Sequence, residues 1–526
     1  MPPGSGFIIA GAVLLVFGVW FGWFGFKGIL KSQIGKQVQL VEGTEMRAVW
    51  SKLPLAIYDD IYFFNVTNPN DVYKGEPPQL EQIGPYCLDE WMEKVGLIDD
   101  EATDSVAFNF KSTFYFNEKR SKGLTGNEEI VMPHFILLGM LLQTARDTPG
   151  ALAFIDKAID PIFNGQKSLY LKTTPNQILF EGIYLNCTSK KVAPKAICAV
   201  LQAKGAEMGV QKAGDNIYKV SIFGHRNATA NKNRLEVLRG KKNFRDVGKV
   251  TKFNGKDKLS MWAGDECNTI QGTDSTIFPP FQKREDDLVF FVADLCRSIR
   301  LQYNGQKISS RGVHGGRHET TFTILANDSA SRCWCPKSGC LDKGALDLSK
   351  CVGAPMILTQ PHFYDGSEKY LSRVRGLNPN KQDHGIYMDI EPITGAAFDV
   401  RMRLQFNMFM YEMKRVHITH NLTSTPILHP LFWIESKVEL DDSLLKPIKM
   451  LYTVIGVVKV IKWLMVLGAF GLMGYGGYNV FLANKNKVKD VVQNTVRKMD
   501  FNGQNSDDKN KMDPYSGSGP NDKIKY

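Results

Sequence analysis

The sequence predicts a large α+β domain held between two transmembrane helices. Three observations carry this prediction. Charged residues avoid two segments of the 526-residue chain, one near each end. All nine cysteines and all five N-x-S/T sequons lie between these segments, and the same stretch mixes short strand-like runs with two apolar helical runs. The 43% apolar content excludes a disordered chain, and a mean hydropathy of −0.21 excludes a multi-span transporter.

The first uncharged segment covers residues 7–26 and follows a stub of residues 1–6. Its twenty residues extend about 30 Å as a helix, which is enough to cross the hydrocarbon core of a bilayer. The stub has no Lys or Arg, the run exceeds a signal-peptide core, and no A-x-A-like cleavage site follows before Lys27. We therefore predict an uncleaved membrane anchor.

The second uncharged segment covers residues 463–483 and is also long enough to cross a membrane. Trp20, Trp23 and Trp463 lie toward the ends of the two runs, where aromatic side chains suit the membrane interface. Both runs are rich in glycine. Glycine permits close approach of two helices, although membrane helices also tolerate it without any specific contact.

The residues between the two anchors, 27–462, are predicted to be extracellular, and the tail, 484–526, to be cytoplasmic. The cluster of cysteines fits an oxidising compartment, and N-x-S/T sequons mark surfaces of secreted domains. Lysines just after the first run oppose this orientation, but long domains translocate largely regardless of charge and lysines also follow the second run. The predicted glycosylation sites are Asn65, Asn186, Asn227, Asn327 and Asn421.

The net charge of +11 first suggests a nucleic-acid partner. The tail holds nine basic and six acidic residues, which leaves +8 for residues 27–462 outside the cytoplasm. A role in binding nucleic acid is therefore not expected. The densest basic stretch, residues 226–258, has eleven basic and three acidic side chains. It is interpreted either as solvated hairpin surface or as a surface that attracts anionic ligands or a partner.

Within this domain, residues 106–116 and 401–413 are predicted strands, because they alternate or are rich in aromatic residues. Residues 134–145 and 151–163 are predicted helices, separated by Asp147, Pro149 and Gly150. Both helices are unusually apolar. They are expected either to be buried against the strands or to line an apolar ligand site.

Six cysteines between residues 267 and 351 form the sharpest local pattern. The spacing of Cys333, Cys335 and Cys340 permits a zinc knuckle, but an extracellular location favours disulfides over metal. Six cysteines allow 15 pairings, so their spacing fixes none of them. Cys187 and Cys198 are candidates for one more bridge, and Cys87 is then left over as a free thiol.

An enzyme is not expected. The sequence His314-Gly-Gly-Arg-His318 resembles the oxyanion loop of some esterases, but the chain has no G-x-S-x-G nucleophile motif. The two histidines also have the i, i+4 spacing of a metal site, yet no third ligand accompanies them and the glycines argue against a helix. We interpret them as part of a loop and expect no metal and no cofactor.

Ordered blocks along nearly the whole chain resemble the class B scavenger receptors and, within that family, the insect sensory neuron membrane proteins. Residues 123–135 and 242–250 look most like the sensory neuron branch, and among its subtypes we favour the first. The blocks that carry the family resemblance are residues 59–69, 81–91, 193–198, 271–281, 294–299, 353–363, 391–395 and 431–435.

The resemblance implies an ectodomain with an antiparallel β core, a helical bundle at its membrane-distal apex and an apolar tunnel that runs toward the bilayer. It also implies the disulfides Cys267–Cys333, Cys296–Cys351 and Cys335–Cys340. In relatives a lysine of the apex region contributes to binding anionic fatty ligands, and its nearest match is Lys167. This match runs through a Gly-rich turn at residues 164–167, so the alternative is an exposed lysine with no role. The ligand-binding residues implied here are Lys167, Phe154, Ile155 and Ile159.

The function that the resemblance implies is that of a non-enzymatic receptor or co-receptor in the plasma membrane of a sensory dendrite or cilium. Its ligands would be long-chain, fatty-acid-derived odorants such as pheromones, passed through the tunnel to the membrane or to an odorant receptor complex. The alternative is a protein-docking scaffold or a general lipid-scavenging receptor.

Overall fold

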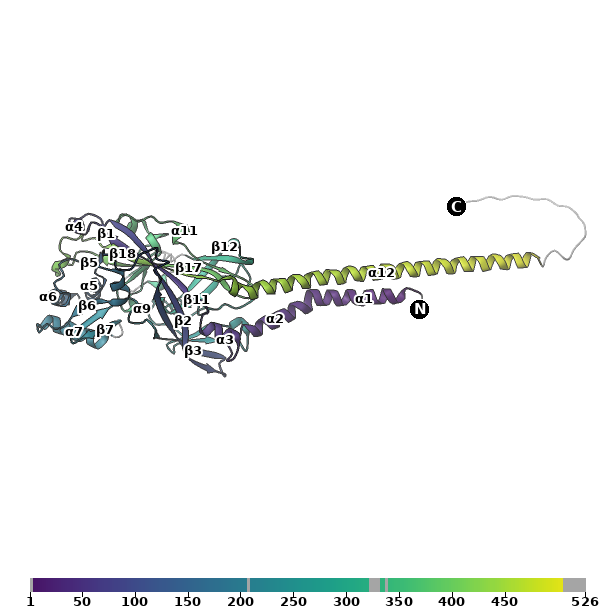
Figure 1. Cartoon of the computed structure of the whole chain (residues 1–526), viewed down its shortest axis with the longest axis horizontal. Helices are drawn as coiled ribbons and strands as arrows, with labels where there is room; N and C mark the ends of the chain where they lie inside the picture. The colour runs from purple at the N-terminus through teal and green to yellow at the C-terminus, as the bar shows by residue number, and fades with distance from the viewer. Residues whose placement is uncertain (1–2, 206–208, 321–331, 336–338, 505–526) are drawn as a thin grey trace, which may run out of the picture. The chain divides into compact units, whose positions relative to one another are not determined.

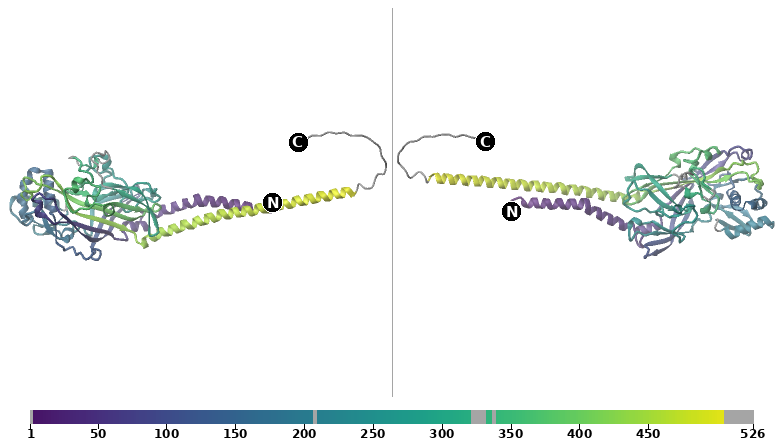
Figure 2. Two further views of the ribbon diagram at one scale, coloured as in Figure 1. Left: turned by 90° about the horizontal axis from the view of Figure 1, so that it is seen from above. Right: turned by 180° about the vertical axis from the view of Figure 1, so that it is seen from behind.

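The computed structural model describes residues 3–205, 209–320, 332–335 and 339–504. The chain divides into two compact units. The large unit is Lys31–Met450, and the small unit combines Met1–Leu30 with Leu451–Tyr526. Figures 1 and 2 show the large unit as a mixed body of strands and helices and the small unit as long helices.

A 13-stranded antiparallel sheet forms the framework of the large unit. Its strands are β1 (Ile57–Val66), β2 (Leu80–Asp100), β3 (Ser105–Phe116), β9 (Thr229–Leu238), β10 (Val250–Phe253), β11 (Leu288–Val292), β12 (Arg297–Ser310), β13 (Val313–Thr320), β14 (Leu346–Asp347), β15 (Ile357–Thr359), β16 (Ile386–Ile390), β17 (Ala397–Met410) and β18 (Ile427–Glu439). The main path runs β10-β9-β3-β2-β1-β18-β17-β16-β13-β12-β11, and β15 joins β14 to β17. Because β1 pairs with both β2 and β18, the two ends of the domain meet at the centre of this path.

The side chains of β17 and β18 show why this sheet forms. On one face, Arg403 lies opposite Glu435 and approaches it to 2.7 Å. On the other face, Phe406 stacks on Phe432 with ring centroids 5.0 Å apart. This alternation has the period of two that a strand requires. The predicted strands at 106–116 and 401–413 are therefore confirmed, as β3 and as most of β17.

Helices and two small sheets gather at one end of the large unit (Figure 1). The helices are α5 (Phe135–Asp147), α6 (Leu152–Ile162) and α7 (Val192–Lys204). The small sheets pair β4 (Ile130–Pro133) with β5 (Tyr170–Thr173), and β8 (Ile217–Val220) with β6 (Ile183–Asn186) and β7 (Val210–Gly214). The two predicted helices are confirmed as α5 and α6, with the break at Thr148–Ala151.

Short helical turns connect these elements. They are α3 (Glu45–Ser51), α4 (Pro69–Val72), η2 (Pro149–Ala151), η3 (Gln177–Glu181), η5 (Phe244–Asp246), α8 (Asp265–Asn268), η6 (Ala293–Leu295), η7 (Arg332–Trp334), α9 (Ser349–Val352), η8 (Pro361–Phe363), α10 (Glu368–Leu371), α11 (Lys381–His384) and η9 (His417–Thr419).

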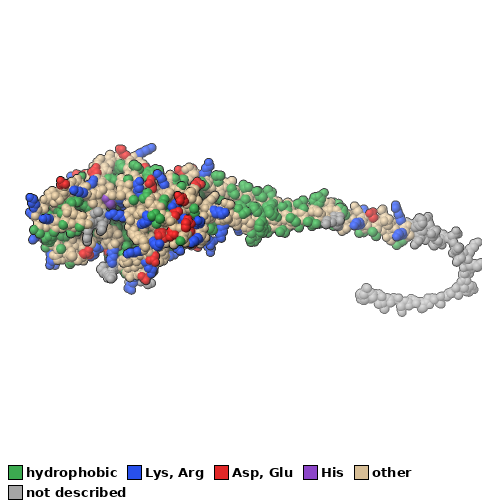
Figure 3. All heavy atoms as spheres, turned by 90° about the horizontal axis from the view of Figure 1, so that it is seen from below, with side chains coloured by type: hydrophobic (Ala, Val, Ile, Leu, Met, Phe, Trp, Pro, Cys, Tyr) green, Lys and Arg blue, Asp and Glu red, His purple; other side chains and the backbone are tan. Residues whose placement is uncertain are grey.

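The small unit is built from the terminal helices. Among the described residues it holds α1 (Ser5–Trp20), the π-helical turn η1 (Phe21–Gly25), the start of α2 (Phe26–Gln37) and most of α12 (Asp442–Gln504). Two helical stretches, Ser5–Gln37 and Asp442–Met499, are long and apolar enough to cross a membrane. Figure 3 shows hydrophobic side chains densely covering part of these helices, with Lys and Arg further along. Both uncharged runs of the sequence lie inside these stretches.

Some of the glycines of the small unit lie at a close helix contact. A Cβ atom on Gly11 would lie 2.7 Å from the carbonyl oxygen of Ala469, and one on Gly476 would lie 2.7 Å from the carbonyl oxygen of Gly4. By contrast, Gly471 and Gly474 have no described neighbour within 4 Å of such an atom. Glycine therefore allows close helix packing at some positions of these helices, and at others it is merely tolerated.

Candidate ligand-binding region

The ligand-binding residues that the resemblance implies lie on α6 and in the turn after it, beside α5. His134 begins α5, because its Nδ1 accepts a hydrogen bond from the backbone N–H of Leu137 at 3.5 Å. The imidazole is buried, and desolvation lowers its pKa to about 4. The inner face of α5 is a row of buried leucines at positions 137, 138, 141 and 142.

The inner face of α6 is equally apolar. Ile155 and Ile159 are only 8% and 4% exposed, and they belong to the same buried cluster as Met408 of β17 and Leu428 of β18. Phe154 lies on the outer side of α6 and is 39% exposed. The structure therefore places two of the implied ligand residues in the domain core and one at its surface.

Lys167 lies at the surface beyond the end of α6. Its Nζ approaches Oδ1 of Asp160 to 2.6 Å, and both side chains are largely exposed. The ammonium group of Lys167 lowers the pKa of the Asp160 carboxyl. Lys167 thus presents a cation to solvent on the same helix–turn segment as Phe154, with one carboxylate already beside it.

The connection between β17 and β18 contacts α6 through polar side chains. The backbone N–H of His417 donates to Oδ1 of Asp156 at 2.8 Å, and the His417 ring contacts the same carboxylate. Tyr73 links the segment after α6 to the same connection, because its hydroxyl accepts a hydrogen bond from the N–H of Leu169 at 2.8 Å and donates one to the carbonyl of Ile418 at 3.1 Å. Neither set of contacts was predicted from the sequence.

Sequence reasoning also missed α7, which packs on α6. Its outer face is apolar yet open to solvent: Val192 is 77% exposed and Val200 is 57% exposed. A disulfide between Cys187, directly after β6, and Cys198 on α7 fixes the helix to the small sheet. The apolar run over residues 192–203 was a signal that could have revealed this helix.

A polar cavity of about 640 Å³ lies elsewhere, over strands β13, β16 and β17. Its arginines already have partners within the fold. Arg317 forms two hydrogen bonds with Asp389, at 2.8 and 2.7 Å, and its guanidinium lies 3.7 Å from the ring centre of Tyr387. Arg403 binds Glu435 and the carbonyl of Gly385. The arrangement stabilises the sheet and does not resemble a site for an aliphatic chain.

The interpretation of His314 and His318 as part of a loop is wrong, because both lie on β13. Strand β13 pairs with β12 and β16, so the intervening glycines Gly315 and Gly316 are held in a ladder and cannot act as an oxyanion loop. Residues four apart on a strand are about 13 Å apart, which is too far for one metal ion. In the described residues, no group of three or more His, Cys, Asp or Glu is placed to hold a metal.

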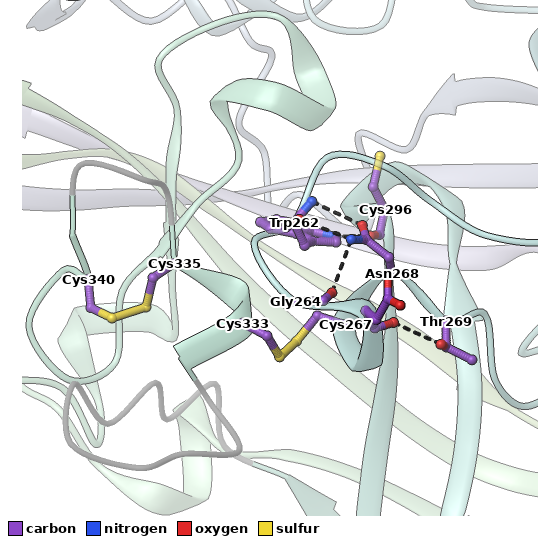
Figure 4. The surroundings of a disulfide bond; sticks show 10 residues. Trp262, Gly264, Cys267, Asn268, Thr269, Cys296, Cys333, Cys335 and Cys340 are labelled. Carbon is purple, nitrogen blue, oxygen red and sulfur yellow. Dashed lines mark hydrogen bonds between the residues drawn. A yellow bond between two sulfur atoms is a disulfide. The ribbon is translucent and has the colours of Figure 1, made fainter.

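Four disulfides brace the large unit, and three of them are the pairs that the resemblance implies: Cys267–Cys333, Cys296–Cys351 and Cys335–Cys340. Figure 4 shows how local hydrogen bonds order the chain around the first of these. The Asn268 side chain donates to the carbonyls of Trp262 and Gly264, and Trp262 Nε1 donates to the carbonyl of Cys296 at 2.7 Å. Cys87 is a buried free thiol.

The four described sequons differ in how their asparagine side chains are engaged. Asn227 accepts a hydrogen bond from the N–H of Phe114 at 2.9 Å and Asn65 one from Val131 at 2.9 Å. Asn186 accepts from its own sequon residue Thr188. Asn421 is exposed, in a positive-φ turn. Asn327 lies outside the described residues.

Comparison with known proteins gives one consistent family. Residues 9–479 match the CD36 family. Sensory neuron membrane protein 1 of Apis mellifera is 39% identical over 93% of this chain and 94% of its own. The proteins of the same name from Plutella xylostella and Heliothis virescens are each 40% identical, over 88% and 89% of this chain and 88% of their own.

Proposed function

The chain belongs to the CD36 family, and on that premise we propose that it is a non-enzymatic receptor or co-receptor for lipophilic, fatty-acid-derived odorants such as pheromones. The ligand enters the large unit near α5 and α6 and passes through an apolar tunnel to the membrane or to a partner odorant receptor. The family binds lipid ligands generally, and the names of the relatives refer to sensory neurons. The proposed location is therefore the dendrite or cilium of a sensory neuron.

The observation that carries this proposal is the continuity of the apolar interior. One buried cluster extends from α5 and α6 to strands β1, β17 and β18, and it includes Ile155, Ile159, Phe63, Met408 and Leu428. An aliphatic ligand gains about 0.8 kcal/mol for each CH2 group that it transfers from water into apolar surroundings. A long chain therefore needs enclosed apolar lining more than it needs specific polar contacts.

Tryptophan substitution along α6 tests the route. We expect Ile155→Trp and Ile159→Trp to reduce responses to long-chain ligands, because each adds bulk on the inner face of the helix. Ala153→Trp and Lys157→Trp are matched controls, since both residues are exposed on the same helix. A variant is used in this test only if antibody labelling of intact cells shows that it still reaches the cell surface.

Direct binding separates ligand capture from docking. The full-length protein in nanodiscs is titrated with a panel of long-chain alcohols, acetates and acids. Loss of binding in the inner-face variants alone supports capture. Unchanged binding and responses across the inner-face positions would contradict capture through α6 and favour the docking alternative, for which the exposed apolar face of α7 is the supporting observation.

A further inference from the structure

A second apolar surface lies on α12, beyond the end of the uncharged run. Five large hydrophobic side chains between residues 488 and 499 are each at least 50% exposed. They are Val488 (62%), Val491 (64%), Val492 (55%), Val496 (50%) and Met499 (68%). Their spacing of three and four residues places them in one stripe along the helix. We refer to these five residues as the tail stripe.

The rest of this helical segment is polar and basic. Between residues 484 and 499 the chain has four lysines and one arginine but a single acidic residue, Asp490. At about 100° per residue, Arg497 lies opposite the tail stripe, whereas Lys489 and Lys498 flank it on its two sides. A helix with one apolar stripe and basic side chains along its edges suits the boundary between lipid and water.

The position of the segment along the chain brings it to that boundary. The uncharged run of 21 residues, 463–483, extends about 32 Å as a helix, which matches the hydrocarbon core. Asn484 is the next residue, so the tail stripe begins within one or two turns of the point where α12 leaves the membrane. A two-pass protein with its large domain outside the cell has this segment in the cytoplasm.

We propose that residues 484–499 form an amphipathic helix that binds the cytoplasmic leaflet of the protein's own membrane, with the tail stripe in the headgroup–acyl boundary and the basic side chains on anionic headgroups. The chain must then bend near Asn484–Asn486, where two asparagines flank Lys485 and helix propensity is low. Charge favours this occupant over a second copy of the chain, because two such segments side by side repel each other. Each basic residue near an anionic surface increases the equilibrium constant for membrane binding by about fivefold.

The cysteine pattern makes the proposal directly testable in the full-length protein. Eight of the nine cysteines form disulfides and Cys87 is buried, so a cysteine added to the tail is the accessible thiol for labelling. An environment-sensitive fluorophore is attached at Val492→Cys, within the tail stripe, or at Gln493→Cys, the matched control one residue further round the helix. The unsubstituted protein measures background labelling.

Both labelled proteins are placed in nanodiscs of phosphatidylcholine alone or with phosphatidylserine, with and without spin-labelled acyl chains. We expect a blue shift and spin-label quenching at position 492 but not at 493, and stronger quenching with phosphatidylserine. Charge reversal at Lys489, Arg497 and Lys498 should remove the phosphatidylserine effect. The increase in quenching at position 492 that phosphatidylserine causes should fall by more than tenfold.

Three outcomes would overturn the proposal. Equal emission at 492 and 493 in every lipid would place the segment in water. Disulfide crosslinking of Val492→Cys between copies, with no lipid dependence, would assign the tail stripe to self-association. A blue shift that requires calcium–calmodulin and not phosphatidylserine would assign it to a protein partner. Thr495→Cys, on the same face of the helix as the tail stripe, repeats the measurement if substitution at 492 lowers expression.

Discussion

Two lysines near the helical end of the large unit have almost the same surroundings. Lys167 and Lys172 are both exposed, and each has one exposed carboxylate partner at 2.6 Å, Asp160 and Glu129 respectively. Only Lys167 follows α6 directly, whereas Lys172 lies on β5. The pair therefore allows the proposed ligand-binding role of Lys167 to be tested against an equivalent surface charge.

We predict that Lys167→Gln weakens binding of long-chain acids by about two- to fivefold, because an exposed ion pair contributes at most about 1 kcal/mol. Binding of the matching alcohols and acetates should not change. Lys172→Gln is the control. Titration of the full-length protein with acid and alcohol of equal chain length measures the difference, and equal effects of the two variants would assign Lys167 no role in binding.

Five histidines of the domain are buried, among them His318, and the other four give it a strong pH dependence: His134, His362, His384 and His429. Burial lowers the pKa of each to about 4, from 6.5 in an unfolded chain. The rings of His362 and His384 also stack 4.4 Å apart, so a proton on either would repel one on the other. Between pH 6.5 and 4 the unfolded chain thus binds more protons than the folded chain.

The free energy of unfolding should therefore fall as the pH is lowered from 6.5 to 4. Each histidine contributes up to about 1.4 kcal/mol for each unit by which its pKa differs between the folded and unfolded chain. Thermal unfolding followed across this range measures the slope. His429→Gln should reduce it, since His429 is fully buried beside Tyr170. His314→Gln should leave it unchanged, because His314 is exposed. The same slope in both variants would show that buried histidine is not its cause.

At the scale of elements, α7 depends on its disulfide more than on burial. The bond joins residues only 11 positions apart, Cys187 and Cys198, and most of the helix surface is exposed. A crosslink across so short a loop contributes about 2–3 kcal/mol by restricting the unfolded segment. The double variant C187S/C198S also keeps the sequon at Asn186, now as Asn-Ser-Thr.

We predict that C187S/C198S accelerates amide hydrogen exchange in Val192–Lys204 by at least tenfold while β17 and β18 stay protected. Mass spectrometry of the full-length protein resolves these segments. Removing the Cys335–Cys340 bond, which spans a separation of 5, is the control and should leave α7 unaffected. Unchanged exchange in α7 would show that packing on α6 is sufficient to hold it.

The same elements show what the sequence could and could not predict. The two apolar runs before and after Pro149 and Gly150 are long and continuous, so α5 and α6 were predicted within a few residues. His314 and His318 were misassigned because glycine between them gives no local strand signal, and their conformation comes from pairing with β16. Periodicity could not show that Ile155 faces inward and Phe154 outward, because the buried face of α6 is set by the elements that pack on it, among them α5 and α7.

At the scale of the whole molecule, net charge alone does not orient the chain in the membrane, because both parts that flank the second membrane run are positive. The tail accounts for +3 of the net charge and residues 27–462 for +8. Within residues 27–462 many basic side chains pair with carboxylates, as in Arg317–Asp389 and Arg239–Glu101, and the +8 is the excess that remains after the acidic residues are counted. The orientation therefore rests on the sequons and disulfides, which all lie between residues 65 and 421, away from both membrane runs.

This orientation makes a prediction that covers the entire chain. Glycosidase treatment should lower and sharpen the apparent mass of the expressed protein, and an epitope tag after Tyr526 should bind antibody only in permeabilised cells. Asn421→Gln should remove part of the mass shift, because Asn421 is exposed. Asn227→Gln should remove less, since that side chain is engaged by the Phe114 backbone in the folded domain. A tag that is accessible on intact cells, or a mass unaffected by glycosidase, would reverse the assignment of the large unit to the outside of the cell.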